Sequence, residues 1–166
     1  MITLHIFNQL SHEEARARLL SCVAIPGWAE ALVCGRPYPS RGTLFRAAHA
    51  CAQTWDENAL TLALRAHPRI GEKPAGVQAE AAFSRQEQGA VNDRDALLAQ
   101  ALREGNARYE ARFGRVFLIR AKGRSGEDIL QALDARLKNS DAQEVQAALA
   151  QLREITLLRL EGVVSE

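Results

Sequence analysis

A histidine that precedes a proline is the first candidate for chemistry in this chain. His67 and Pro68 follow a helical pattern and precede a loop-like stretch that contains Gly71 and Gly76. Proline lacks an amide proton and disfavours the α region for the residue before it, which predicts that the helix ends near Ala66 and that the imidazole is held in place. Because an imidazole titrates near neutral pH, His67 suits general acid–base catalysis. A purely structural interpretation also exists, since a protonated histidine stabilises a helix C-terminus.

The second candidate is the stretch SRQEQ at residues 84–88. Ser84 and Glu87 have the spacing of a capping box, which a helix start uses with or without a ligand. The unpaired amides and partial positive charge of a helix N-terminus also bind anions and carbonyl oxygens. If Glu87 caps the helix, Gln88 is left for a ligand. If Glu87 points into a cleft, it can orient His67 or share a proton with it.

An arginine in the last predicted helix is the third candidate. Val145, Leu149, Leu152 and Ile155 form an apolar stripe, and Arg159 continues it one turn later. A guanidinium at such a position either reaches solvent along the surface or, if buried, requires an acid or an anionic ligand. Its planar fork is well suited to a substrate carboxylate.

The fourth candidate is the stretch FLIRAKG at residues 117–123. Residues 116–119, which overlap the start of this stretch, are β-branched and apolar and predict either a short strand or an extended buried connector. Extended backbone can present N–H and C=O groups to a planar heterocycle. Arg120 and Lys122 either line such a site or reach water.

Composition limits the class of protein. The chain has 166 residues, a formal net charge of +1, 47% hydrophobic and 25% charged residues, which are ordinary globular values. The balanced charge argues against a nucleic-acid partner, and no apolar run approaches the roughly 18 residues of a membrane span. Cys22, Cys34 and Cys51 lack CxxC spacing, which favours reduced thiols in the cytoplasm. The histidines show no metal-ligand spacing and there is no phosphate-binding loop, so we expect a site without metal or cofactor.

The elements that must position these candidates are predicted to be helices. Abundant Ala, Leu, Arg and Glu, together with capping boxes at Ser11, Ser84, Ser125 and Asp141, favour an all-α fold. Helices are predicted over residues 11–23, with a break at 26–27, then over 28–34, 44–55, 56–66, 84–113, 125–137 and 141–160, with a loop at 40–42. We expect one domain over residues 1–166, a compact bundle of about seven or eight helices.

Taken together, several stretches resemble the OHCU decarboxylase family, whose substrate is 2-oxo-4-hydroxy-4-carboxy-5-ureidoimidazoline (OHCU). The matching stretches are HPRIGEK at 67–73, SRQEQ at 84–88, FNQLSHEEA, PGWAEAL, RPY at 36–38, FLIRAKGRS and ITLLRL. The resemblance runs nearly from end to end. It implies an all-α fold, no cofactor, decarboxylation of OHCU to (S)-allantoin in urate breakdown, and a homodimer as a plausible assembly.

The resemblance also implies roles for individual residues. It makes His67 the catalytic histidine, with Glu87 beside it. The residues that it implies for substrate binding are Pro68, Ser84, Arg85, Gln86, Glu87, Gln88, Ile119, Arg120, Ala121, Lys122, Gly123 and Arg159.

Two other interpretations of the sequence remain open. A non-catalytic helical module could bind a small anionic purine derivative with the same helix start and arginine, without proton transfer. A protein-interaction bundle would instead require a large exposed apolar patch. Trp28 and Leu32 are the best candidates for such a patch, although their pattern favours core positions.

Overall fold

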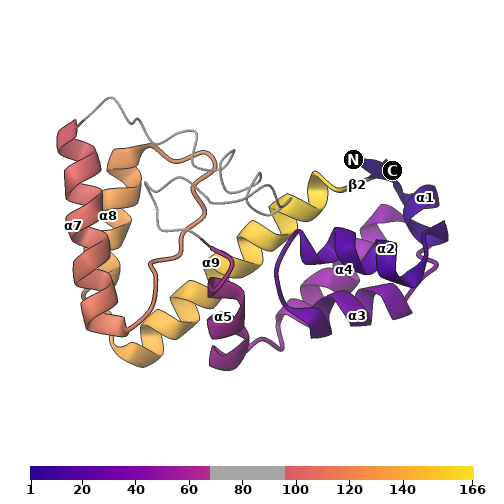
Figure 1. Ribbon diagram of the computed structural model, residues 1–166, viewed down its shortest axis with the longest axis horizontal. Helices are drawn as coiled ribbons and strands as arrows, with labels where there is room; N and C mark the ends of the chain where they lie inside the picture. Colours follow the sequence, from indigo (N-terminus) through magenta and orange to yellow (C-terminus); the bar gives the residue numbers. More distant parts are fainter. Residues whose placement is uncertain (68–95) are drawn as a thin grey trace. The chain divides into compact units, whose positions relative to one another are not determined.

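The computed structural model describes residues 1–67 and 96–166, which are mostly helical (Figure 1). These residues form eight helices and two short strands, which confirms the expected fold class. They divide into two compact units, residues 1–63 with 153–166, and residues 64–152. The organisation as one domain stays a prediction.

The first unit contains both chain termini. Its elements are β1 (Ile2–Thr3), α1 (Leu4–Gln9), α2 (His12–Leu20), α3 (Pro26–Cys34), α4 (Arg41–Ala52), most of α5 (Glu57–Leu64), the end of α9 (Asp141–Glu161) and β2 (Val164–Ser165). The strands pair in parallel, with Ile2 opposite Val164, so the two ends of the chain lie side by side (Figure 1). The sequence patterns indicated neither α1 nor this pairing.

Local caps explain where the helices of the first unit begin. The Ser11 hydroxyl accepts from the Glu14 amide at 3.2 Å, and the Ser40 hydroxyl accepts from the Thr43 amide at 3.1 Å. The predicted loop at residues 40–42 is therefore wrong, because Ser40 caps a helix that already includes Arg41. Pro26 does not stand outside α3 but opens it, since the first helical turn has no use for the missing amide proton.

The core of the first unit accounts for its large aromatic residues. Trp28 and Trp55 pack edge to face with ring centroids 6.3 Å apart, and the Trp28 indole donates to the Ala48 carbonyl. Trp28 and Leu32 are both buried. They are core residues, as their pattern favoured, and not an exposed patch.

The second unit is built from α7 (Ala96–Phe113), α8 (Gly126–Arg136) and the first part of α9. Its apolar core comprises Leu98, Leu102, Tyr109, Phe117, Ile119, Ala121, Ile129 and Leu133. The predicted capping box of α8 is confirmed, because Ser125 and Asp128 each accept from the other's backbone amide. Gly105 of α7 allows close packing, since a Cβ atom there would collide with Leu133.

The start of α9 differs from the prediction. Ser140 and Gln143 form the reciprocal cap, in which the Ser140 hydroxyl accepts from the Gln143 amide and the Gln143 side chain accepts from the Ser140 amide. The predicted box of Asp141 with Glu144 is wrong because Glu144 points into the core and is 0% exposed. Among the described helices, none is long and apolar enough to cross a membrane.

Candidate active site

His67 lies just beyond α5, where a short turn follows the helix. The Asp56 carboxylate accepts from the Ala59 amide at 3.0 Å and caps the start of α5. The helix ends at Leu64, two residues before the predicted end, and the His67 amide donates to the Leu64 carbonyl at 3.1 Å. The imidazole is half-buried. His67 is thus attached by its backbone to the helix end, with a side chain that is neither fully exposed nor lost in the core.

Residues 116–121 form a connector between α7 and α8 rather than a strand. Phe117, Ile119 and Ala121 alternate into the core of the second unit, which is the spacing of extended backbone. The sequence had left open a strand or a buried connector, and the structure shows the connector.

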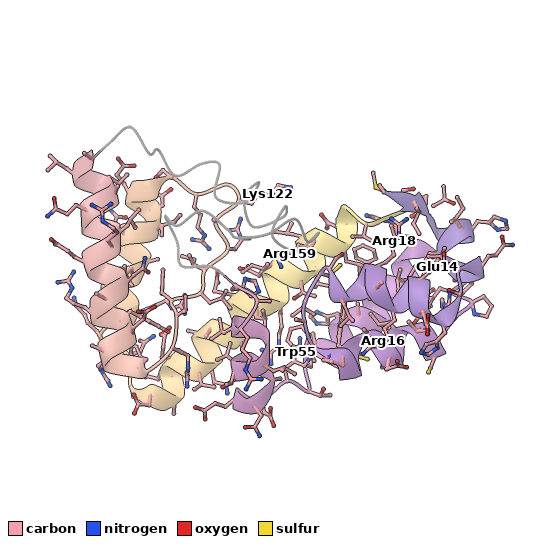
Figure 2. The ribbon with its side chains drawn as sticks, in the orientation of Figure 1. Glu14, Arg16, Arg18, Trp55, Lys122 and Arg159 are labelled. Carbon is pink, nitrogen blue, oxygen red and sulfur yellow. The ribbon has the colours of Figure 1, made fainter. Side chains whose placement is uncertain are left out.

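Arg120 of the connector and Lys122 of the turn that follows it do not belong to the apolar core. The Arg120 guanidinium donates to the Lys122 carbonyl at 2.7 Å, while the Lys122 side chain is exposed (Figure 2). Gly123 has φ +82°, a conformation that favours glycine, and it turns the chain toward the cap of α8. The Arg120 backbone amide donates to the Gln151 side chain of α9 at 2.9 Å.

Arg159 is buried near the end of α9 in the first unit (Figure 2). It is 2% exposed, so it does not reach solvent along the surface. Its Nη1 donates to the Cys22 carbonyl, which lies just past the C-terminus of α2, at 3.2 Å. Of the two alternatives from the sequence, a guanidinium that reaches solvent and a buried one, the structure shows the buried one.

Only part of the predicted site falls within the described residues. His67 and the stretch 119–123 belong to the second unit, whereas Arg159 belongs to the first. Pro68, Ser84, Arg85, Gln86, Glu87 and Gln88 lie outside the described residues. The structure brings Ile119, Arg120, Ala121, Lys122 and Gly123 together on one segment. The remaining assembly of the site stays a prediction.

A buried polar network, which the sequence patterns missed, supports the connector. Glu144 accepts from the Tyr109 hydroxyl at 2.7 Å, from Arg136 Nε at 2.7 Å and from the Asn139 side-chain Nδ2 at 3.1 Å. Arg136 also donates to the Leu118 carbonyl, and its guanidinium stacks over Phe117 with 4.6 Å to the ring centroid. The network thus joins α7, α8 and α9 to the connector.

A signal for this network was present in the sequence. Glu144 precedes Ala148 and Leu152 at intervals of four residues, and these positions belong to the buried stripe of α9. A carboxylate on such a stripe predicts a buried cationic partner, but the spacing does not identify Arg136.

Tyr109 serves this network as a proton donor. Burial raises the pKa of its phenol above the ordinary value, and the hydrogen bond to Glu144 and the charge of that carboxylate act in the same direction. The hydroxyl therefore stays protonated near neutral pH. Tyr109 is suited to holding Glu144 in place and not to accepting a proton from a substrate.

Within residues 1–67 and 96–166, no group of three or more His, Cys, Asp or Glu side chains is arranged to hold a metal ion. The three cysteines are free, and Cys22 is buried.

Comparison with known proteins identifies the family. A family model described as OHCU decarboxylase matches residues 8–161. The 2-oxo-4-hydroxy-4-carboxy-5-ureidoimidazoline decarboxylase of Amia calva is 31% identical over 160 residues, which cover 95% of this chain and 91% of that protein. The uric acid degradation bifunctional protein PucL of Bacillus subtilis is 27% identical over 167 residues, and this chain spans 33% of its length.

Solved structures agree with the sequence relatives. A crystal structure of OHCU decarboxylase in the presence of (S)-allantoin has a TM-score of 0.71 and 25% identity, covering 88% of this chain and 96% of that chain. A crystal structure of (S)-allantoin synthase also has a TM-score of 0.71, at 18% identity, and shows likeness of fold alone. Matched by the family model over almost its whole length, the chain belongs to the OHCU decarboxylase family.

Proposed function

We propose that this chain is a carboxy-lyase that converts OHCU to (S)-allantoin and CO2 in urate degradation. The observation that carries the proposal is the match to the OHCU decarboxylase family over residues 8–161. It is supported by the Amia calva relative, which bears that activity in its name and matches nearly its full length. The structural likeness to a decarboxylase crystallised in the presence of (S)-allantoin points to the same product.

The proposed reaction needs no external electron acceptor. Cleavage of the bond between the ring carbon and the carboxylate releases CO2. The electron pair forms a C=C bond to the carbon that carries the ureido group, and the former C=N pair moves to the ring nitrogen, which takes up a proton. The resulting enol loses its hydroxyl proton to become a carbonyl, and one proton is added to the carbon that carries the ureido group. The protein must therefore orient the carboxylate, move these protons and protect one face of the ring.

We assign the proton transfers to His67. A half-buried imidazole on a residue whose backbone is bonded to a helix end can act as general acid or base, a contribution of typically ~10²–10⁴-fold. In this proposal Glu87 orients the imidazole, and residues 84–88 with Pro68 bind the ring and ureido group. Arg159 binds an anionic or carbonyl oxygen. Fixed dipoles in a pocket that excludes water would supply much of the remaining acceleration.

We propose that the planar ring of OHCU binds against the backbone of residues 119–123. Residues 119–121 are extended, the side chains of Ile119 and Ala121 are anchored in the core, and the backbone N–H and C=O groups lie along the edges of this part. Such groups can pair with the amide and urea groups of OHCU.

Assembly and compartment are proposals too. Three free cysteines suit a reducing compartment, so we propose that the protein acts in the cytoplasm. The family resemblance favours a homodimer, which analytical ultracentrifugation would test. We propose that the protein binds OHCU as its substrate and converts it without a metal or cofactor.

The first test compares the wild-type protein with His67→Ala on freshly generated OHCU. We expect the wild type to speed the loss of OHCU absorbance. The product should be a single enantiomer of allantoin, which circular dichroism detects. His67→Ala should lose at least about 100-fold in kcat while its helical spectrum is unchanged. His49→Ala, a change at an exposed histidine of α4, is the matched control and should retain full activity.

Each negative outcome has a distinct meaning. A wild-type protein that binds (S)-allantoin but does not hasten OHCU loss would refute the decarboxylase and favour a binding module. Near-native turnover by His67→Ala would refute the assigned role of the histidine but not the activity.

A further inference from the structure

Two side chains hold the peptide groups on either side of Ile119. The Leu118 carbonyl accepts from Nη1 of Arg136, and the Arg120 amide donates to the Gln151 side-chain oxygen at 2.9 Å. Both bonds lie within the second unit, and they come from α8 and α9. The connector is thus fixed by side chains along one edge.

This arrangement determines where the Ile119 backbone points. In a trans peptide the C=O and N–H of one plane point in opposite directions. Every described peptide bond around Ile119 is trans. Because Leu118 C=O shares a plane with Ile119 N–H, holding the carbonyl toward Arg136 turns that N–H away. By the same geometry, holding Arg120 N–H toward Gln151 turns Ile119 C=O away from α9.

Ile119 therefore presents one donor and one acceptor on the opposite edge. Its side chain is packed in the core, and the residue is 4% exposed. Within residues 1–67 and 96–166, neither its N–H nor its C=O makes a hydrogen bond. Buried backbone groups are nearly always paired, so this pair is suited to a ligand. A donor and an acceptor on one residue complement an N–H and a neighbouring C=O on one planar ring.

We propose that Gln151 is a positioning residue for substrate binding. It does not touch the substrate, but its side-chain oxygen directs the Ile119 carbonyl toward the ligand. Arg136, neutralised by Glu144, does the same for the Ile119 amide through the Leu118 carbonyl. The ligand edge is that of a cyclic urea or amide. The inference rests on the proposed function, and it adds to the site two residues that do not belong to its binding segments.

Gln151 offers a cleaner experiment than Arg136. Removal of Arg136 would leave the Glu144 carboxylate buried without its cationic partner and would disturb folding. Gln151 is half-buried and neutral. Gln151→Leu deletes the acceptor at similar volume, whereas Gln151→Glu keeps an oxygen at the same place. Gln146→Leu, at an exposed position of the same helix, is the matched control.

The readout is KM and kcat for OHCU, with (S)-allantoin binding measured by calorimetry. We expect Gln151→Leu to raise KM and the allantoin Kd about 3- to 10-fold, the effect of one lost hydrogen bond, with a smaller change in kcat. Gln151→Glu should restore values close to wild type, and Gln146→Leu should match wild type. All variants should keep the wild-type helical spectrum.

Other outcomes separate this inference from the proposed function. If the wild type turns over OHCU and Gln151→Leu leaves both KM and the allantoin Kd unchanged, the positioning role is overturned while the activity stands. The same conclusion follows if Gln151→Glu is as impaired as Gln151→Leu, since an acceptor oxygen would then not be the cause. A wild type that neither turns over OHCU nor binds allantoin overturns both.

Discussion

Four arginines of the first unit bind backbone carbonyls near helix ends, whereas Arg136 of the second unit also binds a buried carboxylate. In the first unit, arginine side chains donate to backbone carbonyls at or just beyond helix C-termini. These pairs are Arg36 with Phe7, Leu10 and Val33, Arg41 with Glu161, Arg153 with Ala52, and Arg159 with Cys22. In the second unit, Arg136 pairs with the buried carboxylate of Glu144.

The difference separates two uses of the same side chain. A helix C-terminus has unpaired carbonyls and a partial negative charge, so a guanidinium stabilises it without a carboxylate. Arg136 is different because its partner Glu144 is 0% exposed and would be a costly buried charge alone. The first unit uses arginines to close helix ends, and the second uses one to build an interior that holds the connector.

The largest predicted effect is at the buried acid. Glu144→Ala leaves Arg136 without its carboxylate and should lower the free energy of unfolding by about 3–5 kcal/mol, measured by urea denaturation. Asp141→Ala is the control, because Asp141 pairs with Arg112 on the surface, has a side chain 82% exposed and should cost under about 1 kcal/mol. Equal losses in the two variants would mean that the buried pair is no more important for stability than a surface pair of the same unit.

A double variant tests whether Arg136 and Glu144 stabilise the fold as a pair. Arg136→Met combined with Glu144→Leu removes both charges and should be less destabilising than the sum of the two single changes. Strict additivity would mean that the two side chains do not act as a pair.

The tyrosine of the network should show an intermediate effect. Tyr109→Phe removes one of the donors to Glu144 and should cost about 1–2 kcal/mol at neutral pH. Burial raises the pKa of Tyr109, and it also raises the pKa of Tyr38. Well below pH 10 both phenols are protonated in the folded and unfolded states alike.

Above pH 10 the raised pKa values of the two tyrosines make the folded protein less stable as pH rises. The unfolded chain releases its phenolic protons from about pH 10 upward, while the folded protein retains them, so stability falls as pH rises. The stability difference between wild type and Tyr109→Phe should therefore narrow above pH 10. Phenolate absorbance should appear with unfolding. A full phenolate signal in the folded protein near pH 10 would contradict both shifts.

The smallest predicted effect belongs to the first unit. Arg36→Met removes donors to carbonyls near the ends of α1 and α3 and should cost about 1 kcal/mol, since neutral acceptors that lose this half-buried donor regain water. Arg46→Met is the matched control, because Arg46 is exposed and should change stability by under about 0.5 kcal/mol. A loss for Arg36→Met as large as that for Glu144→Ala would show that helix-end arginines are as critical as a buried pair.

Features that depend on neighbouring residues were predicted well. The caps at Ser11 and Ser125 and the end of α7 at Phe113 agree with the sequence patterns. The cap of α9 was misplaced by one residue because Ser140, Asp141, Gln143 and Glu144 offer two overlapping boxes. Local spacing cannot choose between them, and the choice follows from burial of Glu144 by α7 and α8.

The candidate site also has features that the sequence indicated and features that only the structure showed. The types and order of His67, Arg120 and Arg159, with the motifs around them, were sufficient to indicate the family and the class of reaction. That Arg159 is interior, and that Gln151 and Arg136 hold the peptides beside Ile119, could not be deduced from the chain order.

The sequence by itself determined the helical class and the starts of α2, α5 and α8, and it indicated residues whose side chains can move a proton, because propensity, capping and side-chain chemistry act within a few residues. The tertiary structure alone decided the pairing of β1 with β2 and the partners of Glu144 and Gln151. Those contacts join residues from 5 to 162 positions apart, and their energy depends on which faces are buried together. No local pattern records that information.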